Sequence, residues 1–306
     1  MARELAGDRA LQVTCLGNSS MPAGFSEAAS ADITRPDALS NALEGRKFDA
    51  VVHCAGLAHQ FGATAPGRFH EVNVTGTANV CRAAGRAGAR HLVLLSSVSV
   101  YGSYGERLVD ESFDCRPEGA YAESKLNAER TAVSYCAENG IELTILRLAT
   151  VVGAGDRGNV ARLIRAIDRR RFVWIGQGAN RKTLVPAPVV ASAVSRVLSV
   201  APDRAAGVFN LALEPLTMRE IVETAARALG RRIFPISIPA GLVLAGLDLL
   251  ASVSPRAGQM SNSVKKWISS DLYCGAEFMR RFAFRPAVTV GQALQEEARA
   301  ISGTRR

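Results

Sequence analysis

Little in this sequence of 306 residues suits metal binding or a disulfide framework. The cysteines form no C-x-x-C pair, and several lie in apolar stretches, so free thiols in a reducing compartment are expected. They stand at Cys15, Cys54, Cys81, Cys115, Cys136 and Cys274. The four histidines have no metal-ligand spacing, and His53 lies within a strand pattern, so we interpret it as a core or cleft residue. We predict no metal site.

A leader peptide and a long apolar run are also missing. The amino terminus is charged and lacks the apolar core of a signal peptide. The longest apolar stretch, residues 238–253, contains Asp248 and has about sixteen residues, too few to span a membrane. We expect a buried or dimer-facing helix there, with peripheral membrane contact as the alternative. The protein is predicted to be cytoplasmic, with no integral membrane segment.

Aromatic residues are sparse, at 6% of the chain, whereas the net charge is +9. Basic blocks such as residues 169–171 stand on no aromatic platform and match no nucleic-acid motif. We therefore expect a solvated face or attraction to an anionic substrate, and no nucleic acid partner.

The sequence does contain an alternation of short apolar runs and helical patterns. Strands are predicted at residues 11–16, 49–55, 92–95 and 143–148, and helices at 36–46, 69–87 and 121–140. This order predicts an α/β fold with a doubly wound, Rossmann-type parallel sheet. Beyond Thr150 the pattern loosens into a smaller α+β domain. The predicted dinucleotide domain comprises 1–151 and 181–212, and the substrate domain comprises 152–180 and 213–306.

Residues 92–125 carry the predicted chemistry. An apolar run ends in SSVSVYG (96–102), typical of a buried parallel strand that delivers serines to a cleft. Tyr121 and Lys125 follow at the start of a helix and, four apart, share a face. An ammonium beside a phenol lowers the phenol pKa from ~10, which suits Tyr121 to acid–base chemistry at an alcohol or carbonyl. Alone, a Tyr-x-x-x-Lys spacing is more often a half-exposed tyrosine; the serines upstream favour the catalytic interpretation.

These stretches resemble the extended short-chain dehydrogenases/reductases, also called NAD-dependent epimerases/dehydratases. The likeness covers most of the chain from Leu11 onward, and nucleotide-sugar epimerases, reductases and dehydratases are the nearest subgroup. It rests on ADIT (31–34), DAVVHCAG (49–56), EVNVTGTANVCRAA (71–84), HLVLLSSVSVYG (91–102), YAESKLNAE (121–129) and ILRLATVVGAGDRGN (145–159). The resemblance implies NAD as cofactor, with NADP left open, a nucleotide-sugar substrate and a homodimer.

The resemblance also implies three sets of site residues. The catalytic set is Ser97, Tyr121 and Lys125, with Ser99 as the substitute for Ser97 if the register shifts. The cofactor set is Asp32, Ile33, Cys54, Ala55, Gly56, Asn73, Tyr121, Lys125 and Thr150. The substrate set is Ser97, Ser99, Arg157, Asn159 and Arg181. Asp32 would accept a hydrogen bond from adenine; its alternative role is an acid at a helix start.

For the dimer, the resemblance pairs helices 69–87 and 121–139 across a two-fold axis. Small side chains would let these helices approach, namely Ala78, Ala83, Ala84, Ala128, Ala132 and Ala137.

Residues 153–158 match G-x-G-x-x-G between a strand and a helix. We do not interpret them as the dinucleotide fingerprint, because they follow the Tyr121/Lys125 pair and no second βαβ unit succeeds them. The resemblance places them beside the nicotinamide and the substrate.

The front of the chain departs most from the family. No glycine-rich turn precedes Leu11, and no acidic residue ends the first strand, so the sequence predicts a sheet whose first strand is missing. We expect the DNA just upstream to encode that strand and turn, and the chain from Met1 to be poorly soluble or to bind NAD(P) weakly.

Three hypotheses follow for function. The favoured one is an NAD(P)-dependent nucleotide-sugar epimerase or ketoreductase, with a dehydratase as a further possibility within the family. The second is a non-catalytic binding or scaffold protein that kept the fold and lost the cofactor. The third is a steroid- or flavonoid-type alcohol dehydrogenase.

Overall fold

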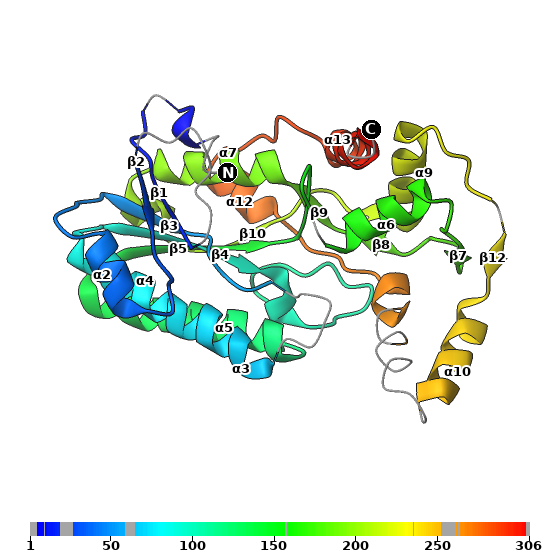
Figure 1. Cartoon of the computed structure of the whole chain (residues 1–306), viewed down its shortest axis with the longest axis horizontal. Helices are drawn as coiled ribbons and strands as arrows, with labels where there is room; N and C mark the ends of the chain where they lie inside the picture. Colours follow the sequence, from blue (N-terminus) through cyan, green and yellow to red (C-terminus); the bar gives the residue numbers. More distant parts are fainter. Residues whose placement is uncertain are drawn as a thin grey trace.

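The computed structural model describes residues 5–8, 10–18, 27–58, 65–156, 158–234, 236–251, 261 and 264–303. A four-stranded parallel sheet lies at its centre, with strand order β10-β5-β4-β3 (Figure 1). The strands are β3 (Ala50–His53), β4 (His91–Ser97), β5 (Glu142–Leu148) and β10 (Gly207–Leu211). The predicted parallel α/β sheet is confirmed, and Ser97 stands at the carboxyl end of β4.

Two further strands form a separate parallel sheet, β1 (Thr14–Gly17) with β2 (Glu27–Ser30), followed by helix α2 (Pro36–Ala42). Among the described residues, neither strand is hydrogen-bonded to β3. β3 is therefore an edge strand, half-buried over its first three residues, whereas β4 is buried over its first four. Leu16 of β1 and Val51 of β3 still pack into one apolar cluster around Leu39.

Helices α4 and α5 pack side by side along one face of the sheet (Figure 1). The helix predicted at 69–87 is divided into α3 (Pro66–Phe69), the π-helical turn η1 (His70–Thr75) and α4 (Gly76–Arg86). α5 (Ala120–Asn139) matches its prediction and ends at Gly140 in the left-handed conformation. Four of the six alanines predicted for a dimer contact are instead buried in this chain's own core: Ala83, Ala84, Ala128 and Ala132. These four side chains bring α4, α5 and the sheet together within one chain, so their assignment to a dimer surface was wrong.

The opposite face of the sheet is covered by α7 (Ala187–Leu198), with α8 (Pro202–Ala205) and α12 (Ala276–Arg281) nearby. Val93 of β4 and Leu146 of β5 point into this layer and are fully buried against Val189 and Val194 of α7. Helices therefore cover both faces, as a doubly wound sheet requires.

The second half of the chain adds short strand pairs and three packed helices. The strand pairs are β6 (Thr150–Val152) with β9 (Leu184–Pro186), β7 (Trp174–Ile175) with β12 (Ser237–Ile238), and β8 (Arg181–Lys182) with β11 (Leu216–Thr217). The helices that share one apolar core are α6 (Asn159–Asp168), α9 (Met218–Ala228) and α13 (Val290–Gly303). Thr217 and Glu220 form a reciprocal capping box at the start of α9, with Thr217 Oγ1 accepting from the Glu220 amide at 3.1 Å.

The apolar stretch 238–253 contains α10 (Ala240–Ala251). Its large side chains are exposed rather than buried, Leu242 by 69% and Leu250 by 54%, so the expectation of a buried helix was wrong. Within the described ranges, no helix is long and apolar enough to cross a membrane. All six cysteines are free, and Cys81 and Cys136 are buried.

Candidate active site

Ser97 and Tyr121 meet at the carboxyl end of β4. Ser97 ends the strand, Tyr121 is the second residue of α5, and their side chains are hydrogen-bonded. The Tyr121 ring packs edge-on against Phe69, with 6.0 Å between centroids. Ser97 Oγ also accepts from the amide of Ser99 at 3.2 Å, whereas Ser99 Oγ is buried without a partner in the described part of the chain. The register therefore brings Ser97, rather than Ser99, to Tyr121.

Lys125 lies one turn further along α5 and is buried. Its Nζ donates to the carbonyl oxygen of Leu95 at 2.7 Å, which ties α5 to β4. Burial lowers the pKa of Lys125 to about 8, and the charges of Glu129 and Cys54 oppose this shift. The amine is therefore protonated at neutral pH and titrates closer to neutrality than an ordinary lysine.

The acidity of Tyr121 differs from the expectation. Burial raises the pKa of its phenol above the ordinary value, and the hydrogen bond with Ser97 opposes that rise. The sequence predicted a pKa lowered by the Lys125 ammonium. In the structure that ammonium hydrogen-bonds Leu95, and removal of the phenol from water dominates. Tyr121 is thus held as a neutral phenol that can donate its proton to an oxygen placed beside Ser97.

Asn73 connects the end of β3 with α5. Its Oδ1 accepts from the amide of Leu57 at 2.7 Å, and its Nδ2 donates to the Leu57 carbonyl at 3.1 Å and to Ser124 Oγ at 2.9 Å. Ser124 Oγ in turn donates to the carbonyl of Tyr121 at 2.7 Å. Asn73 is buried in the π-helical turn η1, a type of turn that often occurs at functional sites. The sequence indicated Asn73 but not its partner Ser124.

His53, the last residue of β3, is buried as predicted. Its Nε2 lies 3.0 Å from Thr77 Oγ1, which donates to the carbonyl of Asn73 at 2.5 Å. Burial lowers the pKa of His53 to about 3, and the positive charge of Lys125 adds to this effect. His53 is therefore neutral at physiological pH. Through Thr77 it is linked to the backbone carbonyl of Asn73.

Behind the site lies a buried ionic network that the sequence analysis missed. Ser96 Oγ donates to the Glu129 carboxylate, which receives Arg147 Nη2 at 2.7 Å. Arg147 Nη1 donates to the hydroxyl of Tyr101 at 3.0 Å, and that hydroxyl donates to Asn210 Oδ1 at 2.9 Å. The network joins α5 to β4, β5 and β10. The position of Glu129, four residues after Lys125 on the same helix, was the available signal.

The residues predicted for adenine lie at the end of β2. Asp32 Oδ1 accepts from both the amide and the hydroxyl of Thr34, at 2.9 and 2.8 Å, so the carboxylate closes the turn before α2. Asn79 Nδ2 donates to the carbonyl of Ile33 at 2.8 Å, and the Ile33 side chain packs tightly over Gly76. Asp32 thus has its structural partner in the turn before α2, and Ile33 has its partners on α4.

Residues 54–56 are exposed where β3 ends, next to the end of β4. Together with Ser97, Tyr121 and Lys125 they border the carboxyl edge of the sheet, the edge at which doubly wound folds bind dinucleotides. This donor set fits the nicotinamide and ribose end of such a cofactor. The described residues before β3 hold no glycine-rich turn, so they provide no such cradle for a pyrophosphate.

The G-x-G-x-x-G segment lies between β6 and α6, outside the central sheet. Asp156 accepts from the amides of Gly158 at 2.7 Å and Ala161 at 3.3 Å, so a carboxylate of the chain itself occupies the N-terminus of α6. An anionic pyrophosphate would be repelled there. The structure therefore agrees that this segment is not the dinucleotide fingerprint.

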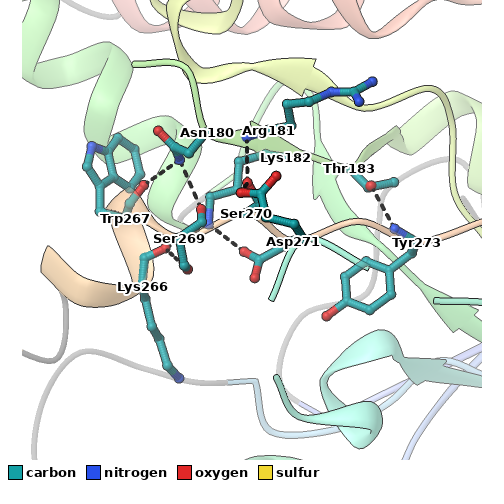
Figure 2. A network of polar contacts seen from close by, with 11 residues as sticks. Asn180, Arg181, Lys182, Thr183, Lys266, Trp267, Ser269, Ser270, Asp271 and Tyr273 are labelled. Carbon is teal, nitrogen blue, oxygen red and sulfur yellow. Dashed lines mark hydrogen bonds and ion pairs between the residues drawn. The ribbon is translucent and has the colours of Figure 1, made fainter. Parts of the chain in front are cut away.

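The remaining substrate candidates are dispersed. Thr150 is exposed at the start of β6, Asn159 is exposed at the start of α6, and Arg157 lies outside the described residues. Arg181 is exposed on β8, and Figure 2 shows its guanidinium directed away from the surrounding polar network. The described residues contain no group of histidine, cysteine or acidic side chains that could hold a metal ion.

A polar network holds the backbone of Arg181 in place (Figure 2). Its amide donates to Ser270 Oγ at 3.2 Å, and its carbonyl accepts from the Asp271 amide at 2.9 Å. The neighbouring Lys182 Nζ reaches Asp271 at 2.5 Å and the carbonyl of Lys266 at 2.7 Å. The segment after residue 264 thus holds the backbone of Arg181 in place. The sequence of β8 by itself gave no indication of this contact.

Comparison with known proteins supplies the relatives of this chain. An N-acetyl-alpha-D-glucosaminyl-diphospho-ditrans,octacis-undecaprenol 4-epimerase from Escherichia coli O157:H7 is 30% identical over 248 residues, covering 78% of this chain and 73% of the relative. A UDP-glucose 4-epimerase from Vibrio cholerae is 32% identical over 143 residues, which span 44% of this chain and 43% of that enzyme.

Solved structures share the fold at lower identity. The UDP-glucuronic acid 4-epimerase from Bacillus cereus, in complex with NAD, aligns over 100% of this chain and 95% of its own with a TM-score of 0.78 and 18% identity. The UDP-glucose 4-epimerase from Thermus thermophilus, also with NAD, aligns over 98% and 95% with a TM-score of 0.76 and 21% identity. The profile of the NAD dependent epimerase/dehydratase family matches residues 1–212. This chain therefore belongs to the NAD dependent epimerase/dehydratase family, a family of NAD-dependent enzymes.

Proposed function

We propose that this protein is an NAD-dependent 4-epimerase of a hexose joined to a diphosphate, with a nucleotide sugar as the substrate. The observation that carries the proposal is the meeting of Ser97, Tyr121 and Lys125 at the carboxyl end of β4. The relatives support the 4-epimerase assignment over a ketoreductase or a dehydratase, because the matched proteins from E. coli and V. cholerae are both 4-epimerases.

Tyr121 acts as the acid–base residue in this proposal. Its phenol exchanges a proton with the sugar oxygen at the reacting carbon, and Ser97 orients that oxygen by a second hydrogen bond. Lys125 keeps the region positively charged and holds the nicotinamide ribose. When bound, NAD supplies reversible hydride acceptance at the sugar carbon.

The cofactor would lie along the carboxyl edge of the sheet. Residues 54–56 allow close approach because they are small and exposed, and Asn73 maintains that loop through Leu57. We assign the adenine end to Asp32 and Ile33, and a nicotinamide-side contact to Thr150. Asp32 keeps its second carboxylate oxygen for this contact while Oδ1 holds Thr34.

The diphosphate of the substrate would be bound by basic residues of the second half. Arg181 is favoured because its backbone is fixed on both sides while its guanidinium is exposed. Arg157, Asn159 and Ser99 are the further candidates that the sequence suggested. A sugar diphosphate is common to the substrates named for the E. coli and V. cholerae relatives, so the chemistry expected of Arg181 is the same for both.

We further propose a cytoplasmic homodimer that uses the exposed faces of α4 and α5. Ala78 and Ala137 remain at least partly exposed there, as does Val133 at 50%. The division into a dinucleotide domain (1–151, 181–212) and a substrate domain (152–180, 213–306) stays a prediction.

The test is an assay of the purified chain with NAD and UDP-glucose or UDP-N-acetylglucosamine, followed by proton NMR of the sugar. We expect the 4-epimer to accumulate, and Arg181→Gln to raise KM about tenfold or more with little change in kcat. Arg196→Gln on α7 is the matched control, because its guanidinium bonds Phe282 and Ser199 far from β8. NAD binding without turnover of any sugar diphosphate would contradict the epimerase proposal, and absence of both would favour the non-catalytic alternative.

A further inference from the structure

Phe234 and residues 236–250 present an apolar surface to solvent that the proposed epimerase does not use. Phe234 is 75% exposed and Ile236 71%, and Leu242 on α10 is 69% exposed. Residues 242, 245, 246 and 249 of α10 are exposed along one stripe of the helix, and residues 241, 248 and 250 beside it are exposed as well. Singly exposed apolar residues are ordinary, but a contiguous group of this kind marks an interaction surface.

The helix lacks the polar face that a surface helix in water normally has. α10 has the sequence AGLVLAGLDLLA, and Asp248 is its single charged residue. That carboxylate accepts from Ser261 Oγ at 2.5 Å and pairs with Lys265 Nζ at 3.2 Å. The negative charge is thus compensated from within the chain.

Basic residues flank this surface on both sides in the sequence. Residues 231–267 contain five basic residues and one acidic residue, Asp248. Arg232 is exposed just before Phe234, and Lys266 is exposed after α10, with its side chain extended away from the polar network in Figure 2. An apolar patch bordered by positive charge is complementary to the surface of an anionic bilayer, since cationic groups meet lipid phosphates while apolar groups enter the acyl boundary.

The surface lies at one end of the molecule, opposite β1 and β2 (Figure 1). It is also anchored to the substrate half. Ile238 pairs with Ile175 in the β12–β7 ladder, and Asn180 Nδ2 donates to the Trp267 carbonyl at 2.9 Å. Docking through α10 would therefore set the orientation of β8 and Arg181 relative to the bilayer.

We propose that the surface formed by Phe234 and residues 236–250 docks on an anionic lipid bilayer. Twelve residues of α-helix extend for about 18 Å, whereas the hydrocarbon core is about 30 Å thick, so α10 lies along the interface. The proposal is independent of the sugar specificity, since it concerns none of the residues of the candidate active site.

Co-sedimentation with vesicles tests it. The chain should bind vesicles of phosphatidylcholine with phosphatidylglycerol, and bind phosphatidylcholine alone much more weakly. Phe234→Ser with Leu242→Ser should reduce binding by about tenfold or more, because each side chain loses its apolar contact. Arg232→Gln and Lys266→Gln should each reduce binding to the anionic vesicles by about fivefold, and added salt should weaken it further.

Leu108→Ser is the matched control, because Leu108 is 53% exposed in the loop before α5, outside residues 234–250, and should leave vesicle binding unchanged. Circular dichroism verifies that each variant is folded. Failure of the wild type to bind anionic vesicles, or equal binding by the Phe234/Leu242 variant, overturns the proposal. Light scattering tests the alternative that a second copy of the chain covers the patch. If the wild type is a dimer that does not bind vesicles, and the double variant is a monomer, the patch is a dimer interface.

Discussion

The two sides of the parallel sheet differ in how completely they are enclosed. On the β4–α5 side, strand residues are buried, Lys125 bonds β4, and the Glu129–Arg147 pair joins α5 to β5. On the β1–β3 side, β3 is an edge strand and β1 pairs only with β2 among the described residues. Both sides are built from similar apolar runs. The comparison shows that burial of a strand, and of a side chain such as Tyr121 beside it, depends on which elements pack against that strand.

The largest expected effect is on the enclosed side. Tyr121→Phe should reduce turnover by about 100- to 10,000-fold, the usual contribution of a general acid–base residue. The phenyl ring retains the edge contact with Phe69, so binding of substrate and the thermal midpoint should change little. Tyr135→Phe on the same helix is the control. Steady-state rates from the NMR assay decide the matter, and near-normal turnover would remove Tyr121 from its role.

Acid should lower the free energy of unfolding through His53, which ends β3 on the less enclosed side of the sheet. Its pKa is about 3 in the folded chain, against 6.5 for the ordinary side chain. Between these values the unfolded chain binds a proton that the folded chain does not, so the free energy of unfolding falls as pH falls from 6.5 toward 3, by up to a few kcal/mol. His53→Gln should flatten this slope in urea titrations, whereas His70→Gln, at an exposed position, should not. Equal slopes for both variants and the wild type would contradict the assignment.

Asn73 links the loop after β3 to α5, so its removal should lower the free energy of unfolding. Asn73→Ala deletes two bonds to Leu57 and one to Ser124, at an expected cost of about 2–3 kcal/mol. NAD affinity should fall in parallel, measured by calorimetry. Asn127→Ala on the more open face of α5 should cost less than about 0.5 kcal/mol. Equal losses for the two variants would show that Asn73 has no special connecting role.

The smallest expected effect comes from valine-to-alanine substitutions that compare the burial of β3 with that of β4. Val52 of β3 and Val93 of β4 are paired in register, but only Val93 is fully buried. Val93→Ala should destabilise the fold by about 2 kcal/mol, and Val52→Ala by less than about 1 kcal/mol. Urea denaturation measures both, and a reversal of this order would show that β3 is as enclosed as β4.

Sequence patterns succeeded where local chemistry dominates. The helical pattern at residues 121–140 located α5, which ends at Gly140. The strand ending in serines also located the site, because the carboxyl ends of parallel strands meet at one edge. Patterns failed for the alanines of α4 and α5, because a periodic pattern shows which residues share a helix face but not which element packs against that face. They failed likewise for α10, whose apolar composition resembles that of a core helix.

The sequence by itself determined the alternation of strands and helices, the parallel sheet and the set of Ser97, Tyr121 and Lys125, because these follow from spacing and residue type within short segments. Only the tertiary structure decided that Ser97 rather than Ser99 bonds Tyr121, that burial raises the pKa of that phenol, and that Asn73 and Ser124 join its helix to β3. It also decided that Leu242 faces solvent. The reason is physical: solvation and hydrogen-bond partners are set by segments remote in the sequence, and no local pattern records them.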